Sequence, residues 1–381
     1  MNSPKILFGV CGIGRGHVYE MLPIIENYVI LRRARIVIFS FGESYRYFNT
    51  KYKNKKNVLI VKVKVPWIHG GPNGLDYLRT AKDKQNQSKD YIVKNFDAME
   101  KVKEFLGKPD VVITDYEPIS AMYAYSIGSK LITIDQQSKY LLSGYPSKIA
   151  GLTPNEECSR LGMFFPRADL RIINSFFRFP SNHPECLKDK YVTYGPIIRN
   201  DIVSIKNKFT GNSNDVLVYL SPYSPFVQDP EELLRIFKQV NDFRFHIFTS
   251  CYIKYKQAQK NEGAPNVEIR RYNEEGFLEA LQTCRSVISS AGHTLLSELI
   301  FLGKPVLAVP LNTYEQHYSA CVIDRGHYGM MAKRLSIKNI RKFLDSLDRY
   351  ESSIETNGYG QLYRNPAQVK IIRAIDSIMR K

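Results

Sequence analysis

The chain has 381 residues, of which 44% are hydrophobic and 24% charged, and 54 Lys and Arg against 37 Asp and Glu give it a net charge of +17. This length exceeds what one hydrophobic core usually organises, so it predicts two domains, and the composition excludes a disordered chain. No run of 18 apolar residues occurs, which argues against a membrane-spanning helix. The six cysteines have no CxxC spacing, which favours reduced cytoplasmic thiols over disulfides or zinc ligands.

Short apolar runs alternate with helix-like segments through the first half of the chain. The runs predicted to be strands are 5–11, 35–41, 57–63, 110–115 and 130–135, and the clearest predicted helices are 92–106 and 119–127. Strands that are apolar throughout are buried on both faces. The alternation therefore predicts an α/β domain with a parallel sheet covered by helices.

The same alternation restarts after a polar stretch at 200–214, which we interpret as a linker. The predicted strands here are 216–221, 244–250, 266–272, 286–290 and 305–311, and the predicted helices are 230–240, 276–284 and 294–303. An amphipathic helix is predicted at 366–380. The sequence thus predicts an N-terminal domain at 1–199, a C-terminal domain at 200–365 and a terminal helical segment at 366–381.

The first motif is GIGRGH, Gly12 to His17, where the first predicted strand ends and a helix begins. Ligands bind at this edge of open α/β sheets, and the residues Gly14, Arg15 and Gly16 form a candidate loop for a phosphate or an acceptor. The spacing fits a dinucleotide fingerprint poorly, because the third glycine comes one residue early. His17 is a candidate general base with a pKa suited to taking a proton at neutral pH, and a structural histidine is the alternative.

Asp115 ends the predicted strand 110–115, at another carboxyl edge of the sheet. Its carboxylate could accept a hydrogen bond from His17 and stabilise the imidazolium, as the aspartate of a catalytic triad does. The alternative is a helix-capping aspartate before Pro118. Asp135, at the end of 130–135, is a weaker candidate for the same role.

The third motif lies at 289–320, where a small-residue turn, Ser290 to Gly292, precedes a predicted helix that starts with His293 and Thr294. Free N–H groups at such a helix start can bind a diphosphate. Glu298 follows one helical turn later and could accept hydrogen bonds from a ribose diol. After the next strand come Glu315 and Gln316, which could meet sugar hydroxyls.

The run 289–320 resembles the nucleotide-sugar motif of GT-B glycosyltransferases, particularly the UDP-glycosyltransferases and the peptidoglycan lipid-intermediate N-acetylglucosaminyltransferase. GIGRGH with ITDYEP resembles their N-terminal counterpart, and the resemblance covers nearly the whole chain in order. It implies two Rossmann-like domains with a cleft between them, an acceptor-binding N-terminal domain, a nucleotide-sugar-binding C-terminal domain, and a last helix that crosses back to the first domain. It implies that His17 and Asp115 form the catalytic pair. It also implies a donor site made of Ser221, Arg271, Tyr272, Gly292, His293, Thr294, Glu298, Glu315 and Gln316.

The sequence departs from the family pattern at three points: Ala291 replaces a usual glycine, the plant-type tryptophan is absent because the only tryptophan is Trp67, and the N-terminal glycine loop reads GIGRGH. The donor base and the acceptor are therefore left open. No Asp-x-Asp occurs, so we expect no metal and no cofactor beyond the nucleotide-sugar. The expected reaction is direct displacement at the anomeric carbon, with inversion.

Two other functions stay open from the sequence: a nucleotide-sugar epimerase of the same architecture, and a non-catalytic nucleotide or nucleic-acid binding protein. The segment 46–64 carries seven basic residues and no acidic one. It could contact an anionic membrane surface or a nucleic acid, or be a solvated loop. The expected location is the cytoplasm, including the inner face of the membrane, and a lipid-linked or nucleic-acid acceptor would fit the charge.

Overall fold

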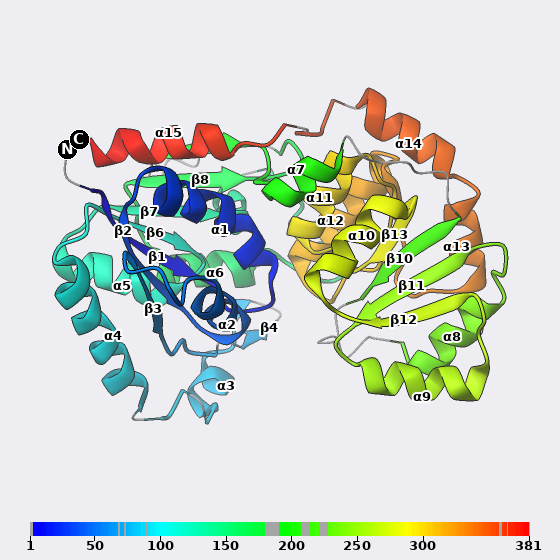
Figure 1. Ribbon diagram of the computed structural model, residues 1–381, viewed down its shortest axis with the longest axis horizontal. Coiled ribbons are helices and arrows are strands. Elements are labelled where there is room, and N and C mark those ends of the chain that lie inside the picture. The colour runs from blue at the N-terminus through cyan, green and yellow to red at the C-terminus, as the bar shows by residue number, and fades with distance from the viewer. Residues whose placement is uncertain are drawn as a thin grey trace. The chain divides into compact units, whose positions relative to one another are not determined.

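The computed structural model describes residues 3–67, 69–71, 74–84, 86–88, 90–142, 144–179, 190–206, 214–220, 228–357, 360–363 and 365–380. The chain forms two compact units (Figure 1). One consists of Met1–Arg199 with Asn365–Lys381, and the other of Asn200–Arg364. Each unit has its own parallel sheet and its own hydrophobic core.

The first unit is built on a seven-stranded parallel sheet with the order β3-β2-β1-β6-β7-β8-β9. Its strands are β1 (Lys5–Val10), β2 (Arg35–Ser40), β3 (Val58–Lys62), β6 (Val111–Asp115), β7 (Leu131–Asp135), β8 (Leu170–Asn174) and β9 (Tyr191–Tyr194). A separate two-stranded hairpin joins β4 (Gly70–Gly71) to β5 (Gly74–Leu75). The strands β6 and β7 are buried along their whole length, as their continuous apolar runs predicted.

Helices cover both faces of this sheet. They are α1 (Gly16–Glu26), which continues as a π-helical segment at Asn27–Leu31, α2 (Gly42–Lys51), α4 (Asp90–Leu106), α5 (Pro118–Ile127), a 3-10 turn at Gln137–Leu141, α6 (Asn155–Phe164) and α15 (Gln368–Met379). The short helix α3 (Tyr77–Lys82) buries none of its side chains. Side chains of α1, α2 and α15 pack together with strand residues in one core cluster. Side chains of α4, α5 and α6 pack in the cluster on the other face.

The last helix, α15, belongs to the first unit although it follows the second in sequence (red in Figure 1). Its residues Ile371 and Ile375 are fully buried against α1 and the sheet. The Tyr28 hydroxyl donates a 2.8 Å hydrogen bond to Asp376, which also pairs with Arg32. The predicted return of the terminal helix to the first domain is confirmed.

The second unit contains a six-stranded parallel sheet with the order β12-β11-β10-β13-β14-β15. Its strands are β10 (Asp215–Tyr219), β11 (Arg244–Thr249), β12 (Val267–Arg271), β13 (Ser286–Ser289), β14 (Val306–Ala308) and β15 (Gly329–Met331). Its helices are α7 (Asn200–Lys206), α8 (Pro230–Lys238), α9 (Tyr252–Glu262), α10 (Glu274–Thr283), α11 (His293–Leu302), α12 (Tyr314–Arg325), α13 (Ile337–Leu344) and α14 (Leu347–Thr356). The side chains of α8, α9, α13 and α14 build the core on one face.

The polar stretch 200–214 is not a simple linker, because its first half folds as α7. Ile202 of this helix is fully buried, and Lys206 lies 4.1 Å from the centre of the Phe301 ring on α11. The burial of a single apolar side chain outweighs the polar composition here. Residues 207–213 lie outside the described part of the chain.

Both sheets reverse their direction of winding next to their first strand. In the first unit β1 lies between β2 and β6, and in the second β10 lies between β11 and β13. In open α/β sheets, ligands bind at the carboxyl ends of the strands beside such a reversal. The loops after β1, β6, β10 and β13 are therefore the candidate ligand-binding loops. Of the helices that the structure describes, none is long and apolar enough to cross a bilayer.

Candidate active site

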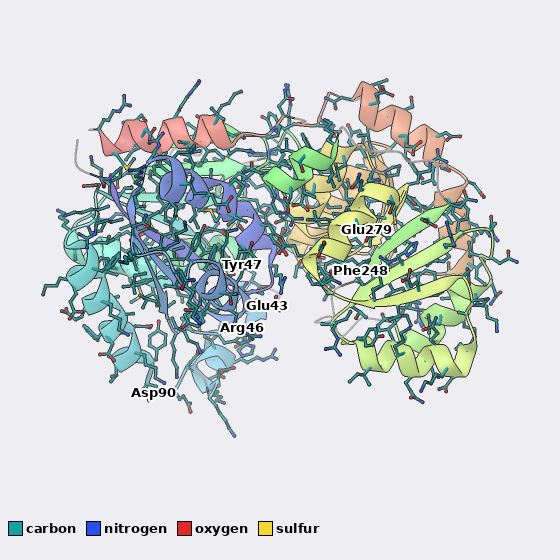
Figure 2. The ribbon with its side chains drawn as sticks, viewed as in Figure 1. Glu43, Arg46, Tyr47, Asp90, Phe248 and Glu279 are labelled. Carbon is teal, nitrogen blue, oxygen red and sulfur yellow. The ribbon has the colours of Figure 1, made fainter. Side chains whose placement is uncertain are left out.

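The glycine loop after β1 has a path that only glycine permits at two positions. A side chain at Gly12 would meet the Phe41 carbonyl oxygen, 2.1 Å from an ideal Cβ, and Gly14 has a left-handed φ of 71°. The loop is held by the Glu43 amide, which donates to the Gly12 carbonyl over 3.2 Å. Arg15 lies 3.8 Å from Glu43, which Figure 2 labels on α2. The loop thus delivers Gly16 and His17 to the first turn of α1.

His17 and Asp115 are in direct contact. The His17 Nδ1 lies 2.9 Å from both carboxylate oxygens of Asp115. The carboxylate is 1% exposed and the imidazole 19% exposed. Because Nδ1 donates to Asp115, the neutral ring keeps its lone pair on Nε2, the nitrogen that a base would use.

Asp115 is not the cap of α5, because Glu117 performs that function. The Glu117 carboxylate accepts hydrogen bonds of 2.8 Å from the amides of Ile119 and Ser120. Asp115 is consequently left to pair with His17. Asp135, the other candidate partner, uses its carboxylate to accept from Ser138, at 2.5 Å from the amide and 2.9 Å from the hydroxyl.

The surroundings change the pKa of His17 in a direction that the sequence did not predict. Burial alone would lower the pKa, but the Asp115 carboxylate and Cys11 outweigh burial and raise it well above its ordinary value of 6.5. Burial raises the pKa of Asp115, and the positive His17 ring opposes that shift. The expectation of a pKa near neutrality is therefore corrected: His17 holds its proton more firmly, because a buried carboxylate faces it.

The start of α11 carries the candidate diphosphate site in the second unit. Gly292 is the capping residue, and no side chain caps the helix. An ideal Cβ at Gly292 meets no atom within 4 Å, so the space in front of the helix is open among the described residues. His293 is buried and Thr294 half-buried in the first turn. An uncapped, accessible helix start of this kind attracts anions.

Glu298 lies on the same helix and is only 3% exposed. Its carboxylate is therefore more deeply buried than its expected contact with a ribose diol requires. Other residues of α11, including Leu296 and Leu299, are buried as well. A substitution here must therefore be controlled for folding.

Glu315 and Gln316 occupy the first turn of α12, which Thr313 caps. The Gln316 side-chain oxygen accepts a 2.9 Å hydrogen bond from the Leu311 amide. This bond ties the helix start to the end of the preceding strand, so Gln316 has a local structural role in addition to any contact with sugar. Its amide N–H groups remain the part of the side chain suited to a hydroxyl ligand.

Arg271 ends β12, and Tyr272 after it belongs to an aromatic cluster. The rings of Tyr272 and Tyr219 have centroids 5.5 Å apart, and both pack on Phe277 at 5.4 and 5.1 Å. Phe248, labelled in Figure 2, meets Phe277 edge-on. Sequence reasoning missed Tyr219, although it ends β10 and so lies at the ligand-binding edge. Ser221 lies outside the described residues.

Two further polar groups of the first unit were also missed. Glu20 lies one turn after His17 on α1 and is 5% exposed, and Asn174 at the end of β8 is 2% exposed. The Asn174 side-chain nitrogen donates a 2.5 Å hydrogen bond to Glu20. A glutamate between Val18 and Met21, on an otherwise apolar helix, was the signal in the sequence. Across the described ranges, no cluster of three or more His, Cys, Asp or Glu is arranged to hold a metal ion.

The sequence of this chain matches a known protein family and is similar to part of known relatives. Residues 4–348 match the sequence pattern of the family described as glycosyl transferase family 1. A UDP-N-acetylglucosamine–N-acetylmuramyl-(pentapeptide) pyrophosphoryl-undecaprenol N-acetylglucosamine transferase of Bacillus thuringiensis (strain Al Hakam) is 28% identical over 137 residues. That match covers 34% of this chain and 38% of the relative, so it spans well under half of either protein.

Solved structures of similar fold cover the whole chain. A UDP-glucose:anthocyanidin 3-O-glucosyltransferase in complex with UDP has a TM-score of 0.67 and 12% identity, covering 100% of this chain and 99% of that one. Arabidopsis thaliana UGT89C1 has a TM-score of 0.64 and 14% identity, covering 99% of this chain and 100% of that one. At these identities the likeness shows a shared fold.

Proposed function

Because this chain belongs to glycosyl transferase family 1 and is therefore a glycosyltransferase of GT-B type, we propose that it transfers a sugar from a UDP-linked donor to an acceptor hydroxyl, with inversion. The observation that carries the proposal is the His17–Asp115 pair, 2.9 Å apart at the reversal point of the first sheet. UDP is the donor nucleotide named for the relatives and bound in solved structures of similar fold.

In the proposed reaction His17 takes the proton of the acceptor hydroxyl through Nε2. The acceptor oxygen then forms a bond to the anomeric carbon while the bond from that carbon to the diphosphate oxygen breaks. The electron pair leaves with UDP, and the negative charge that develops there is stabilised by the start of α11. Attack from the side opposite the leaving group inverts the anomeric configuration.

The most direct test is a product analysis with a panel of UDP-sugars. With donor and acceptor together, we expect UDP and a glycosylated product in equal amounts. With donor alone, we expect slow hydrolysis to UDP and free sugar. Conversion of donor alone into an isomeric UDP-sugar would instead identify the epimerase, and binding of UDP without any turnover would identify the non-catalytic alternative.

We further propose that the reaction needs no divalent metal. The support is the lack of any Asp-x-Asp in the sequence, together with the helix start available to the diphosphate. Transfer should proceed at an unchanged rate in excess EDTA. The control is the same assay with added Mg²⁺ or Mn²⁺, and a loss of activity with EDTA that Mn²⁺ restores would contradict the proposal.

We propose a lipid surface as the anionic partner of the carboxyl-terminal end of the basic segment 46–64, at Lys62 and Lys64, together with the residues that follow it. The strand β3 divides this segment, because Lys53, Lys55 and Lys56 precede it whereas Lys62 and Lys64 lie at its carboxyl end. The segments that follow that carboxyl end carry a set of exposed apolar side chains, which we call the apolar surface: Trp67, Tyr77, Leu78, Ile92, Val93 and Phe96. Insertion of such side chains suits lipid better than nucleic acid.

Hydrogen bonds connect the segments that carry the apolar surface, and Asn86 also donates a 2.8 Å bond to the Thr80 carbonyl of α3. The Trp67 amide donates to Asn86 over 2.7 Å, and Lys64 exchanges hydrogen bonds of 2.9 and 2.8 Å with Asn95 of α4. Lys64 also reaches Asp90, which Figure 2 labels at the start of α4. Arg79 and Lys82 on α3 add exposed positive charge to it. Apolar groups ringed by cations fit the interface of an anionic bilayer.

Reversing three cations beside the apolar surface, in Lys62→Glu/Arg79→Glu/Lys82→Glu, should weaken binding to vesicles that contain anionic lipid. Each cation near such a surface contributes about 1 kcal/mol, so a loss of roughly 100-fold or more is expected. The matched control reverses Lys53, Lys55 and Lys56, at the other end of β3, and should bind normally. Cosedimentation at rising salt measures both, and equal behaviour of the two triple variants would contradict the assignment.

A further inference from the structure

Three carboxyl groups are buried at the carboxyl edge of the first sheet. Glu20 comes from α1, Asp115 from β6 and Asp135 from β7, and they are 5%, 1% and 2% exposed. Asp115 faces the His17 imidazole at 2.9 Å, and Asp135 has the Arg171 guanidinium as its neighbouring cation. Glu20 has no cation of its own among the described residues. If all three carboxyl groups were ionised, their negative charges would repel one another, because a buried site contains little water to screen them.

The unpartnered oxygen of Asn174 fits a neutral Glu20 carboxyl group, whereas the bond that Asn174 donates favours the ionised form. The Asn174 nitrogen donates to one Glu20 oxygen over 2.5 Å, while the Asn174 side-chain oxygen is buried with no hydrogen-bond partner. A carboxylate can only accept, and would leave that oxygen unsatisfied. A protonated Glu20 has an O–H to offer to the same amide, as carboxylic acids do when they pair with amides.

We propose that Glu20 is a positioning residue of the transfer reaction, which stays neutral at neutral pH and so limits how firmly the neighbouring His17 holds its proton. The proposal rests on the proposed role of His17 as the base. The groups that face Glu20 are His17 on its own helix, Asp115 on β6, Asp135 on β7 and the neutral Asn174 on β8. An ionised Glu20 would add a negative charge near the imidazolium and favour its protonated form.

The titration of Glu20 sets the pH range in which this matters. Burial, followed by the charge of Asp115, raises the pKa of Glu20 to about 8. Below pH 8 the carboxyl is therefore mostly neutral, and above it the new charge raises the pKa of His17. Because the pKa of Glu20 is higher in the folded than in the unfolded chain, the free energy of unfolding should fall as pH rises toward 8.

The test is Glu20→Gln, which keeps the shape of the carboxyl and its bond to Asn174 but never ionises. At pH 7 its kcat/KM should match that of the wild type, and above pH 8 it should exceed the wild type by up to about tenfold, the limit set by a shift of one pKa unit in His17. The control is Glu117→Gln, which alters another buried carboxyl of the same unit and should leave the shape of the pH profile unchanged. A Glu20→Gln profile parallel to that of the wild type at every pH would overturn the proposal.

A second measurement separates this proposal from the proposed function. Nitrogen NMR of the full chain, with His17→Ala to assign the signal, should show the His17 titration about one unit lower in Glu20→Gln. Asn174→Ala removes the donor that favours the ionised carboxyl, so it should move the titration in the same direction by less. A shifted titration in a chain that transfers no sugar would contradict the proposed function alone. An unshifted titration would contradict the role of Glu20 alone.

Discussion

The substitution His17→Ala should lower kcat by roughly 10²–10⁴, the usual contribution of one proton-transfer group. The Kd for UDP should stay nearly unchanged, because the candidate diphosphate site is at the start of α11 in the other unit. Steady-state kinetics and calorimetry with UDP measure the two quantities separately. Full kcat in His17→Ala would place the base elsewhere.

Asp115→Asn provides the matched partner to this variant. It keeps the geometry but removes the charge that stabilises the imidazolium, so its loss in kcat should be equal or smaller. The double variant should be little worse than His17→Ala, because the two groups, 2.9 Å apart, act as a unit. Additive losses would show that Asp115 acts independently of His17.

The pH profile should report the raised pKa of His17. A base must be unprotonated to act, so kcat/KM should increase with pH, and the increase should occur above the ordinary pKa of 6.5 because Asp115 favours the imidazolium. The same ionisation should be missing in His17→Ala. The free energy of unfolding should change in the opposite direction to kcat/KM. The paired imidazolium stabilises the folded chain at low pH, and this contribution is lost as pH rises through the folded-state pKa of His17.

Glu298→Ala should weaken donor binding by roughly 10- to 100-fold, because a lost hydrogen bond to a charged group costs about 1.5–3 kcal/mol. Since Glu298 is only 3% exposed, Glu298→Gln serves as the control that keeps the buried volume. Gln should also weaken binding, because its nitrogen cannot accept from a diol, but its thermal unfolding should stay close to that of the wild type.

Two measurements made together test whether Glu298 binds the ribose of the donor. Calorimetry with the UDP-sugar gives the Kd, and thermal unfolding shows whether the variant is folded at the temperature used. An unchanged Kd in a folded Glu298→Ala would remove the assignment to the ribose. A weakened Kd in Glu298→Ala with normal binding in Glu298→Gln would show that shape and packing, and not hydrogen bonding, explain the effect.

The architecture could be predicted because its signals are local. Strands such as β6 and β7 are continuous apolar runs, and each ends in an aspartate that marks the carboxyl edge of the sheet. Placing β1 beside β6 brings the residues after them together, and this is why the contact of His17 with Asp115 could be expected from the chain order. The α/β fold class was predicted from such signals and the family from the resemblance of the motifs at 12–17 and 289–320, and both are confirmed.

The electrostatics of the site could not be predicted, because they depend on burial and on residues distant in sequence. Glu20 meets Asn174 across 154 positions of sequence, and no local pattern connects them. The direction of the His17 pKa shift depends on the balance between burial and the Asp115 charge. The strands β8 and β9 and the helix α7 were missed for a related reason: they are short segments, and pairing with neighbouring strands or packing against other elements sets their structure. The roles of the donor-site residues stay predictions.

The position of α15 in the first unit affects the order in which the protein can fold during synthesis. The ribosome makes the segment up to Arg199 first, but Ile371 and Ile375, which complete one side of that unit's core, emerge only after the whole second unit. Until then the apolar face between α1 and the sheet lacks its covering helix and is open to chaperones or to wrong partners. The second unit, continuous from Asn200 to Arg364, can close its core while the first is still incomplete.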